Sequence, residues 1–426
     1  MTTEKPRKIS KKDKDILRKL AARQAEIADL PVQEATELAW RRLNALKPGR
    51  PLVWINEIPW HEMNVNDGLT LTTEDEFCRG LEWQLRATLY QWEHLRGDMV
   101  VEPVIRSPVV IRDSGFGIGE DARYLRTDSQ SGVCSREFHP QIQALADIEK
   151  IKMPVVTVDE DASRLNYEIL RKLFRGILEV ESYGVGAQWF APWDELIRWW
   201  GVEPALMDMA LRPELVHAAM DRLVSAYLCR LDQYEKLNLF SLNNGNFRIG
   251  SGGLGFTGEL PQNDFDPGKV TTRDQWGNAT AQIFSEVSPE MHWEFALQYE
   301  MRWLERFGMT YYGCCEPLHM KMDMLKRVPN LRKISMSPWI DMDKAVERVG
   351  NGYVFSYKPS PAVLATDQWN PAHARQVLRA ALEKPCKSGC IVEVIMKDIS
   401  TLRYEPRRLW EWAGIAMDVV QELGPR

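Results

Sequence analysis

The spacing of apolar residues changes character near Gly49. Over residues 9–46 apolar side chains recur every three or four positions among lysines and arginines, which predicts helices. From residue 52 onward, short runs of valine, isoleucine, leucine and aromatic residues alternate with longer stretches of helical period. We therefore divide the chain into an N-terminal helical extension, residues 1–48, and a larger unit, residues 49–426.

Eight of the short apolar runs have the composition of β-strands. They cover residues 52–56, 99–104, 183–189, 237–242, 309–315, 331–336, 352–357 and 390–396. Strands that alternate with helices form parallel sheets, and eight such units make a (β/α)8 barrel. The pattern predicts an α/β fold of this TIM-barrel kind, with its active site at the carboxyl ends of the strands.

Two stretches, residues 107–157 and 247–280, are longer than ordinary connections between secondary-structure elements. Long loops on the active-site face of a barrel are typical of lids and binding arms. The second stretch contains Gly250-Ser-Gly-Gly-Leu-Gly, which superficially resembles a phosphate-binding loop. It does not lie tightly between a strand and a helix, and no Lys-Ser or Lys-Thr pair follows it, so we expect no phosphate site there.

Composition and charge narrow the class of function. The net charge of −6 over 426 residues provides no basic surface for nucleic acid, and no run of about 18 apolar residues is present to span a membrane. Residues 1–14 are rich in lysine and lack the apolar core of a secretory signal, so we expect a cytoplasmic protein. The 7 cysteines are scattered and odd in number, which favours reduced thiols.

The candidate metal ligands cluster in one place. An apolar, aromatic run is followed directly by Cys314, Cys315 and Glu316, with His319 three residues later. Thiolate, carboxylate and imidazole groups together suit Zn²⁺. Because residues two apart share one face of a strand, we expect Cys314 and Glu316 to lie on one side and Cys315 on the other. Glu393, in the last predicted strand, is a further candidate ligand. A buried structural pair of cysteines is the alternative interpretation.

The ends of the other predicted strands provide polar and aromatic groups. Glu57 and His61 are candidate acid and base, although a salt link at the rim is an equal alternative. Lys358 and Lys397 are candidate catalytic hydrogen-bond donors. The 16 tryptophans suit a pocket for a flat ligand. The candidate substrate-binding residues at the strand ends are Trp60, Trp189, Asn243, Asn244 and Trp339.

Four stretches of sequence carry a resemblance to a known family. They are Ala191–Leu196, Arg212–Met220, Ser288–Phe295 and Ile334–Asp341. In this order, they make the chain resemble the uroporphyrinogen decarboxylase superfamily, whose (β/α)8 members include zinc-dependent methyltransferases that act on corrinoid-bound methyl groups. The arginine-rich motif with which true decarboxylases of this family bind a tetrapyrrole is absent after Pro51, which argues against uroporphyrinogen as the substrate.

The resemblance implies a metal-dependent methyltransferase. Tyr312 and Cys314 match the zinc-binding His-x-Cys motif of that branch, which makes Tyr312 a further substrate-binding candidate, and Glu393 or Asp398 lies near its last cysteine ligand. A metal with fewer thiolates is more electrophilic, which suits an ether or amine substrate. The implied reaction takes a methyl group from a small donor, such as a methoxylated aromatic, and passes it to the cobalt of a separate corrinoid protein, with zinc as Lewis acid.

Two other functions remain open alongside the methyltransferase. One is a decarboxylase or other lyase that uses acid and base groups without a metal. The other is a non-catalytic barrel that binds a small aromatic or tetrapyrrole ligand. Stoichiometric zinc in the purified protein would favour the transferase over both. A homodimer is a further open question, because tryptophan patches can form an interface as well as a pocket.

Overall fold

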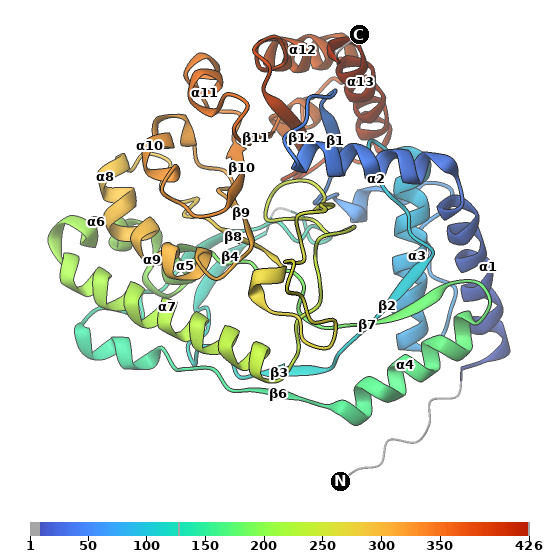
Figure 1. The fold of residues 1–426 in the computed structure, drawn as a ribbon, viewed down its shortest axis with the longest axis horizontal. Helices are drawn as coiled ribbons and strands as arrows, with labels where there is room; N and C mark the ends of the chain where they lie inside the picture. The colour runs from blue at the N-terminus through green and yellow to red at the C-terminus, as the bar shows by residue number, and fades with distance from the viewer. Residues whose placement is uncertain (1–8, 127, 425–426) are drawn as a thin grey trace.

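The computed structural model describes residues 9–126 and 128–424, so residues 1–8 of the predicted extension lie outside the described part. Helices α1 (Lys11–Ala28) and α2 (Pro31–Asn44) fill most of the remainder of that extension. The side chain of Ser10 caps α1 by accepting a hydrogen bond from the backbone of Asp13. Figure 1 shows α1 lying along α3 (Glu76–His94), against which it packs its apolar face.

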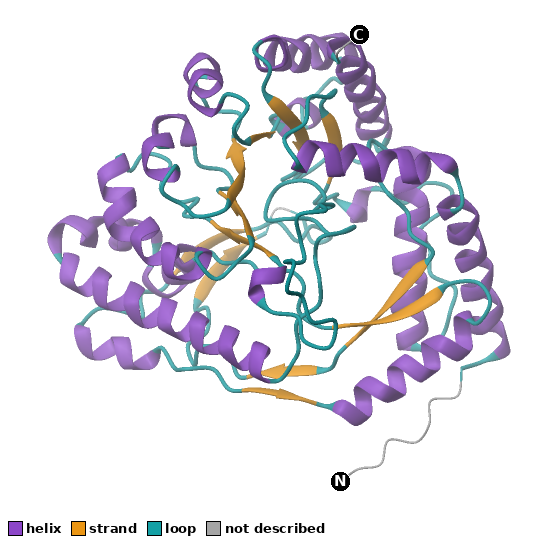
Figure 2. Cartoon of the chain, viewed as in Figure 1, coloured by secondary structure: helices purple, strands orange, loops and turns teal. Residues whose placement is uncertain are grey.

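Six parallel strands form the main sheet, in the order β1-β12-β11-β10-β9-β8, with helices around it (Figure 2). Glu393 pairs in register with Leu52 on one neighbouring strand and with Ser356 on the other. The α/β class predicted from the sequence is thereby confirmed. The strands are β1 (Leu52–Ile55), β8 (Trp276–Ala279), β9 (Met309–Tyr312), β10 (Leu331–Met336), β11 (Val354–Tyr357) and β12 (Ile391–Met396).

Two further parallel strands, β2 (Val104–Pro108) and β7 (Glu179–Tyr183), pair with each other and not with the main sheet. Beyond β7, a single parallel bridge joins Val185 to Phe240. The ladders among residues 9–126 and 128–424 therefore comprise a six-stranded sheet and two-stranded pairs, and they do not form one continuous eight-stranded sheet.

Side-chain amides connect the segment after β7 to β8 where a ladder is missing. Asn243 donates to the carbonyl oxygens of Gly186 and Trp276 at 2.6 and 2.9 Å, and its own oxygen accepts from the Trp276 amide at 2.8 Å. Gln275 donates to the carbonyl oxygens of Val185 and Ser241 at 2.9 and 2.6 Å. These bonds satisfy buried backbone groups that a strand would otherwise satisfy.

The long stretch 107–157 contains structure of its own. Strand β3 (Ile111–Asp113) pairs antiparallel with β6 (Val156–Val158). Strand β4 (Ala122–Leu125) pairs antiparallel with β5 (Ser135–Phe138). The sequence predicted only an extended loop here, because each of these strands has four residues or fewer.

Several strand predictions need correction. Residues 237–242 contribute only the bridge at Phe240, and β2 begins at Val104, where the prediction placed the end of a strand. Strand β8 lies inside the stretch expected to be a loop. Its sequence, Trp-Gly-Asn-Ala, has no β-branched residue, so burial of the whole strand outweighs its weak intrinsic preference.

The remaining helices surround the sheet, and proline at the first turn favours the start of several of them. A π-helical turn, Trp293–Leu297, joins two of them. None of the helices among the described residues combines the length and the apolar character needed to cross a membrane. The helices are α4 (Glu160–Phe174), α5 (Pro192–Trp200), α6 (Val202–Leu211), α7 (Pro213–Lys236), α8 (Pro289–His292), α9 (Gln298–Leu304), α10 (Met322–Leu325), α11 (Met342–Val349), α12 (Pro371–Lys387) and α13 (Arg407–Leu423).

The glycine-rich segment 249–256 fills the interior beside the main sheet instead of acting as a lid. A Cβ atom on Gly252 would lie 2.6 Å from the carboxylate of Glu393, and one on Gly253 would lie 2.4 Å from the indole of Trp40. Any larger residue at these two positions would collide with the buried side chains, so both positions require glycine. The segment contacts the carboxylate of Glu393, to which the Gly253 amide donates a hydrogen bond.

Candidate functional site

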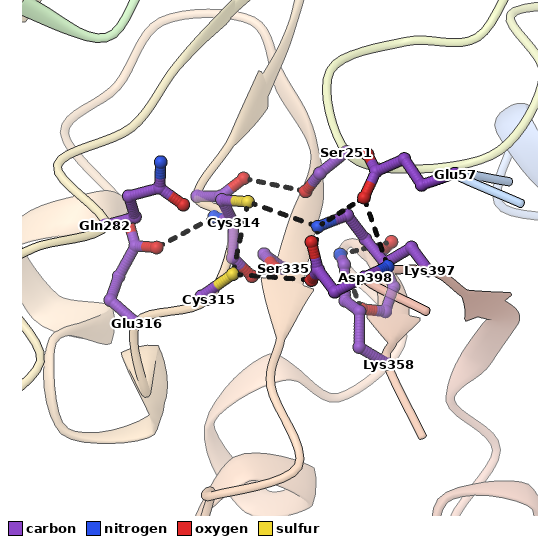
Figure 3. Close-up of polar contacts among 12 residues, drawn as sticks. Glu57, Ser251, Gln282, Cys314, Cys315, Glu316, Ser335, Lys358, Lys397 and Asp398 are labelled. Atoms are coloured by element: carbon purple, nitrogen blue, oxygen red, sulfur yellow. Dashed lines mark hydrogen bonds and ion pairs between the residues drawn. The ribbon is translucent and has the colours of Figure 1, made fainter. Parts of the chain in front are cut away.

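The candidate site begins where β9 ends and the chain turns at Gly313, whose φ is +95°. Because the strand stops at Tyr312, the alternation of faces does not extend to residue 316. The sulfur atoms of Cys314 and Cys315 lie 3.5 Å apart on the same side (Figure 3). The expectation that Cys315 faces away from Cys314 is therefore wrong.

Glu316 turns back toward the backbone of its own loop. Its Oε2 accepts a hydrogen bond from the Cys314 amide at 2.8 Å, and its Oε1 accepts one from Thr280 Oγ1 at 2.9 Å. The side chain is fully buried. Glu316 thus holds the turn that presents the two cysteines, and Gln282 lies beside it in Figure 3.

Lys397, the first residue after β12, places its ammonium group beside the cysteines. Its Nζ lies 3.7 Å from Cys314 Sγ, 2.6 Å from Asp398 Oδ2 and 3.4 Å from Glu57 Oε2. Burial acts to lower the pKa of Lys397, but the negative charges of Cys314, Cys315, Glu57 and Asp398 outweigh burial and raise it. Lys397 therefore stays charged at neutral pH.

The thiol of Cys314 is the more acidic of the two. The hydrogen bond from Cys315 is the largest cause that lowers the pKa of Cys314, and the charge of Lys397 adds to it against the opposing effect of burial. The same contact raises the pKa of Cys315, with burial acting in the same direction. As the pH rises, the pair therefore loses one proton well before it loses the second, and the resulting negative charge is favoured at Cys314.

Two residues at the mouth of the site have left-handed backbone conformations. Glu57, after β1, has φ of 52°, and Asp398, after β12, has φ of 56°. The Asp398 amide donates to Glu57 Oε2 at 3.1 Å, and Arg248 donates to Glu57 Oε1 at 2.9 Å. Non-glycine residues with positive φ are uncommon and gather at functional sites. This geometry fixes two carboxylates next to Lys397.

Glu57 is a weak candidate for a general base. Burial acts to raise its pKa, but Lys397, the Asp398 amide and Arg248 lower it to about 2. A carboxylate with so low a pKa takes up a proton poorly at neutral pH. The sequence left two roles open for Glu57, a catalytic acid or base and a salt link at the rim. In the structure Glu57 forms ion pairs with Arg248 and Lys397, as the second role requires.

Lys358 lies one layer deeper than Lys397, at the end of β11. Its Nζ donates to Ser356 O and Ser356 Oγ, both at 3.1 Å, and to the hydroxyl of Tyr311. Burial lowers the pKa of Lys358 to about 7. A buried amine with this pKa is suited to accept or donate a proton near neutral pH.

The deepest layer is a fully buried ion pair. Lys333 Nζ lies 2.8 Å from Glu393 Oε2, and the Gly253 amide donates to Glu393 Oε1 at 3.1 Å. Burial acts to raise the pKa of Glu393, but Lys333 lowers it. The carboxylate of Glu393, a predicted metal ligand, is thus engaged in an ion pair with Lys333 and lies deeper in the interior than the cysteines.

The four predicted zinc ligands do not converge. Glu316 is bonded to its own loop, Glu393 is paired with Lys333, and His319 lies on the short 3-10 helix Leu318–Met320 with its buried Nδ1 unpartnered. Across residues 9–126 and 128–424, no three His, Cys, Asp or Glu side chains are arranged to hold a metal ion. The residues as folded do not fit the zinc ion that the resemblance implies.

Unlike Glu57, the other predicted residues after β1, His61 and Trp60, make their contacts away from the cysteines. His61 Nε2 is 3.6 Å from Glu62 Oε1 and 3.8 Å from Asp128 Oδ2. Trp60 packs edge-on against Trp83, with ring centroids 5.5 Å apart. Glu62, which the sequence did not single out, accepts a hydrogen bond from Thr401 Oγ1 at 2.6 Å and joins this loop to the one after β12.

Two predicted tryptophans lie exposed at the carboxyl edge of the strands. Trp339, after β10, is 74% exposed, and Trp189, after β7, is 44% exposed. The indole of Trp189 donates to Asp194 Oδ2 at 3.4 Å, and Gln282 donates to the same oxygen at 2.6 Å. Asn243 and Asn244 instead bond backbone carbonyl groups, Asn244 donating to Leu260 O at 2.6 Å.

Tyr312 faces the opposite side of β9 from Tyr311 and the cysteines. Its hydroxyl donates to Glu300 Oε2 and lies close to His292 Nε2, both at 2.7 Å, and His292 Nδ1 lies 3.0 Å from Lys321 Nζ. These four residues form a second buried network, which the sequence did not predict. The inner residue of the pair, Tyr311, is the tyrosine that lies near Lys358.

The sequence contained a period-two signal for Lys333, Ser335 and Ser356, which the prediction missed. Lys333 and Ser335 alternate with apolar residues in β10, and Ser356 alternates with apolar residues in β11, two positions before the predicted Lys358. Polar residues at every second position of a buried strand indicate a polar interior. Apart from Glu393, the candidates were chosen at or beyond the strand ends, so Lys333 and the serines of the deeper layer were missed.

Comparison with solved structures finds a weak similarity of backbone fold. A methyltransferase from Methanosarcina mazei matches with a TM-score of 0.48 and 10% sequence identity, over 91% of this chain and 98% of that chain. No protein-family model matches the chain, and no curated protein sequence matches it. A likeness at this level does not bear on the reaction, so the function is argued from the site.

Proposed function

We propose that the chain is a methyltransferase in which Cys314 receives the methyl group. The observation that carries the proposal is the Cys314 thiol, held 3.7 Å from the ammonium group of Lys397 at the carboxyl ends of parallel strands. Active sites of α/β proteins lie at this edge, and a thiolate is a strong nucleophile. The four sequence stretches that resemble a superfamily with methyltransferase members support the class of reaction.

The proposed chemistry uses side chains of this chain alone. The Cys314 thiolate attacks the methyl carbon of an ether, a sulfur–carbon bond forms, and the carbon–oxygen bond breaks. The leaving oxygen departs as an anion that the Lys397 ammonium stabilises. In a second displacement an electron-rich acceptor takes the methyl group and Cys314 leaves as the thiolate. We route no step through zinc, because its expected ligands do not converge.

The proposed donor is a methoxylated aromatic, and the proposed acceptor is a reduced corrinoid on a separate protein. The exposed indoles of Trp189 and Trp339 support an aromatic donor, because flat rings stack favourably on indole faces. The resemblance supports the corrinoid acceptor. The exposed position of Asp398, with 51% of its side chain accessible, supports approach of a large partner at this mouth.

The test is to detect the methyl group on the enzyme. Incubation with an isotopically labelled methoxylated aromatic, without acceptor, should leave one labelled methyl group on Cys314 in peptide mass spectra. A reduced corrinoid protein added afterwards should remove it. Cys314→Ser should lose both steps, and Cys386→Ser, at the end of α12, is the matched control that should keep both. Label that never appears on Cys314 refutes the assignment.

Metal content decides between this proposal and the zinc version. If the purified chain contains stoichiometric zinc, and a chelator that removes it abolishes methyl transfer, then a metal supplies the activation and the covalent role of Cys314 is wrong. If transfer survives chelation, the thiolate mechanism stands.

A second candidate function is favoured by Lys358. A decarboxylase needs a proton donor for the carbanion that remains when carbon dioxide leaves, and Lys358 is a buried amine whose pKa is about 7. Release of carbon dioxide from aromatic carboxylates, lost in Lys358→Met and kept in Cys314→Ser, would favour this function over methyl transfer.

A further inference from the structure

We propose that Cys314 and Cys315 form a site of reversible oxidation by peroxide, in which Cys314 is oxidised first and Cys315 then closes a disulfide with it. The sulfur atoms of the two residues are 3.5 Å apart, close to van der Waals contact. This site is a property of the two thiols, and it does not depend on the methyl-transfer proposal.

Opposite charges distinguish the two sulfur atoms. Lys397 Nζ lies 3.7 Å from Cys314 Sγ, and Asp398 Oδ2 lies 3.7 Å from Cys315 Sγ (Figure 3). An ammonium group favours the thiolate, whereas a carboxylate disfavours it. Peroxide reacts with the thiolate form, so Cys314 is the sulfur that reacts and Cys315 is a neighbouring thiol held ready to resolve the product.

Access to the pair is from the side of Cys315. Cys314 is 4% exposed, but Cys315 is only half-buried, and the side chain of Asp398 next to it is 51% exposed. A molecule as small as hydrogen peroxide can approach along Cys315. A large thiol reagent meets Cys315 first. The geometry therefore favours a small oxidant.

The reaction balances with peroxide as the only oxidant. The Cys314 thiolate attacks one oxygen of hydrogen peroxide, giving a sulfenic acid and hydroxide. The Cys315 thiol then displaces water from that sulfur, which forms the disulfide. Neighbouring Cα atoms are about 3.8 Å apart, shorter than the range of about 4.4–6.8 Å in ordinary disulfides, so the product is strained and readily reduced. The oxidation is therefore reversible by mild thiols.

Oxidation would also alter the surroundings of Lys397. The disulfide carries no charge, so Lys397 loses its sulfur counter-charge and keeps Glu57 and Asp398 as partners. The site would then have no nucleophilic thiolate. Oxidation thus switches off any reaction that uses Cys314, and a reductant restores it.

The test is titration of the intact chain with hydrogen peroxide, followed by peptide mass spectrometry. The peptide that contains Cys314 and Cys315 should lose two hydrogen atoms, about tenfold faster than Cys386 or Cys390 is modified, because burial raises the pKa of both of those thiols. Dithiothreitol should restore the original mass. Equal rates at the two pairs, or a product that dithiothreitol does not reduce, would overturn the proposal.

Three variants assign the two roles. Cys315→Ser should stop at the sulfenic acid, which dimedone traps on Cys314, and Cys314→Ser should be oxidised slowly at Cys315. Cys386→Ser should behave as the parent chain does. Dimedone labelling on Cys315 in the parent chain, or a disulfide to any other cysteine, would contradict the assignment. Because the readout is mass and not methyl transfer, failure here leaves the proposed function intact, and the reverse also holds.

Discussion

The two faces of strand β9 differ in how their buried polar side chains are paired. On the inner face, Tyr311 lies among lysines that have negative partners, Lys397 beside Cys314 and Lys333 beside Glu393. On the outer face, Tyr312 lies in a chain of hydrogen bonds with His292 and Glu300. Both faces are buried and polar. The inner face pairs carboxylates with lysines, whereas the carboxyl group of Glu300 on the outer face has no lysine beside it in its hydrogen bonds.

The difference shows what a buried group needs in order to remain charged. Burial raises the pKa of Glu300 to about 8, and it lowers the pKa of His292 well below its usual value, so both are neutral near pH 7. Glu393, equally buried, has its pKa lowered by Lys333. A lysine in contact therefore keeps Glu393 ionised, whereas Glu300, which has no such partner, is protonated.

The largest expected effect follows from breaking the innermost ion pair. Lys333→Met leaves the Glu393 carboxylate buried without its partner, which should cost about 3–5 kcal/mol of the free energy of unfolding. Chemical denaturation measures this. The double variant Lys333→Met with Glu393→Leu removes both charges and should recover much of the loss. Equal stability of the parent and the single variant would mean that the pair is not an ionised one.

The two adjacent tyrosines provide a matched pair of substitutions. Tyr312→Phe removes the hydroxyl that joins His292 to Glu300 and should cost about 1–3 kcal/mol of the free energy of unfolding, with little effect on the reactivity of Cys314. Tyr311→Phe removes a hydrogen-bond partner of Lys358 and should change methyl transfer or its pH profile as well. If both variants alter only stability, the inner face is not a reactive site.

Glu300→Gln tests the neutral character of the outer face through pH. The folded chain keeps the Glu300 proton up to about pH 8, whereas the unfolded chain releases it near the ordinary value of 4.5. The free energy of unfolding therefore falls between these values, by about 1.4 kcal/mol per pH unit for a single group. Glutamine removes this slope and mimics the protonated acid. Parallel stability curves for the two chains would contradict a raised pKa.

Lys397→Met should have the smallest effect on stability and a selective effect on Cys314. The lysine lowers the pKa of Cys314, though less than the hydrogen bond from Cys315 does, so its removal should raise that pKa. Thiolate absorbance in the ultraviolet, followed against pH, measures the change. Cys315→Ala should raise the pKa further. Lys387→Met, on the surface at the end of α12, is the control that should leave the titration unchanged.

Sequence reasoning predicted the α/β class and the proximity of Cys314 to Lys397, because both depend on local signals. Alternating strands and helices predicted a parallel sheet, and Cys314 and Lys397 do lie together at its carboxyl edge. Contacts between residues far apart in the sequence could not be predicted in this way. Strand β8 forms from Trp-Gly-Asn-Ala because neighbouring strands bury it, and Asn243 bonds backbone groups because a ladder is missing there.

The orientation of the site residues was beyond the sequence for a geometric reason. Alternation holds only while a strand continues, and β9 ends two residues before Cys314. Gly313, with φ of +95°, turns the chain so that Cys315 joins Cys314 and Glu316 folds back. The position of a strand's last residue is the least certain part of a prediction, and here it decides which side chains meet.

The glycine-rich segment that fills the interior has a consequence for the order of events. The backbone at Gly252 and Gly253 packs directly against Glu393, Tyr311 and Trp40, so the chain itself occupies the space beside these buried side chains. A molecule that reaches the buried Cys314 therefore approaches from the side of Cys315, which is only half-buried. In the proposed reaction, a donor and an acceptor that both approach from this side would bind one after the other, which is why the proposal holds the methyl group on Cys314 between the two steps.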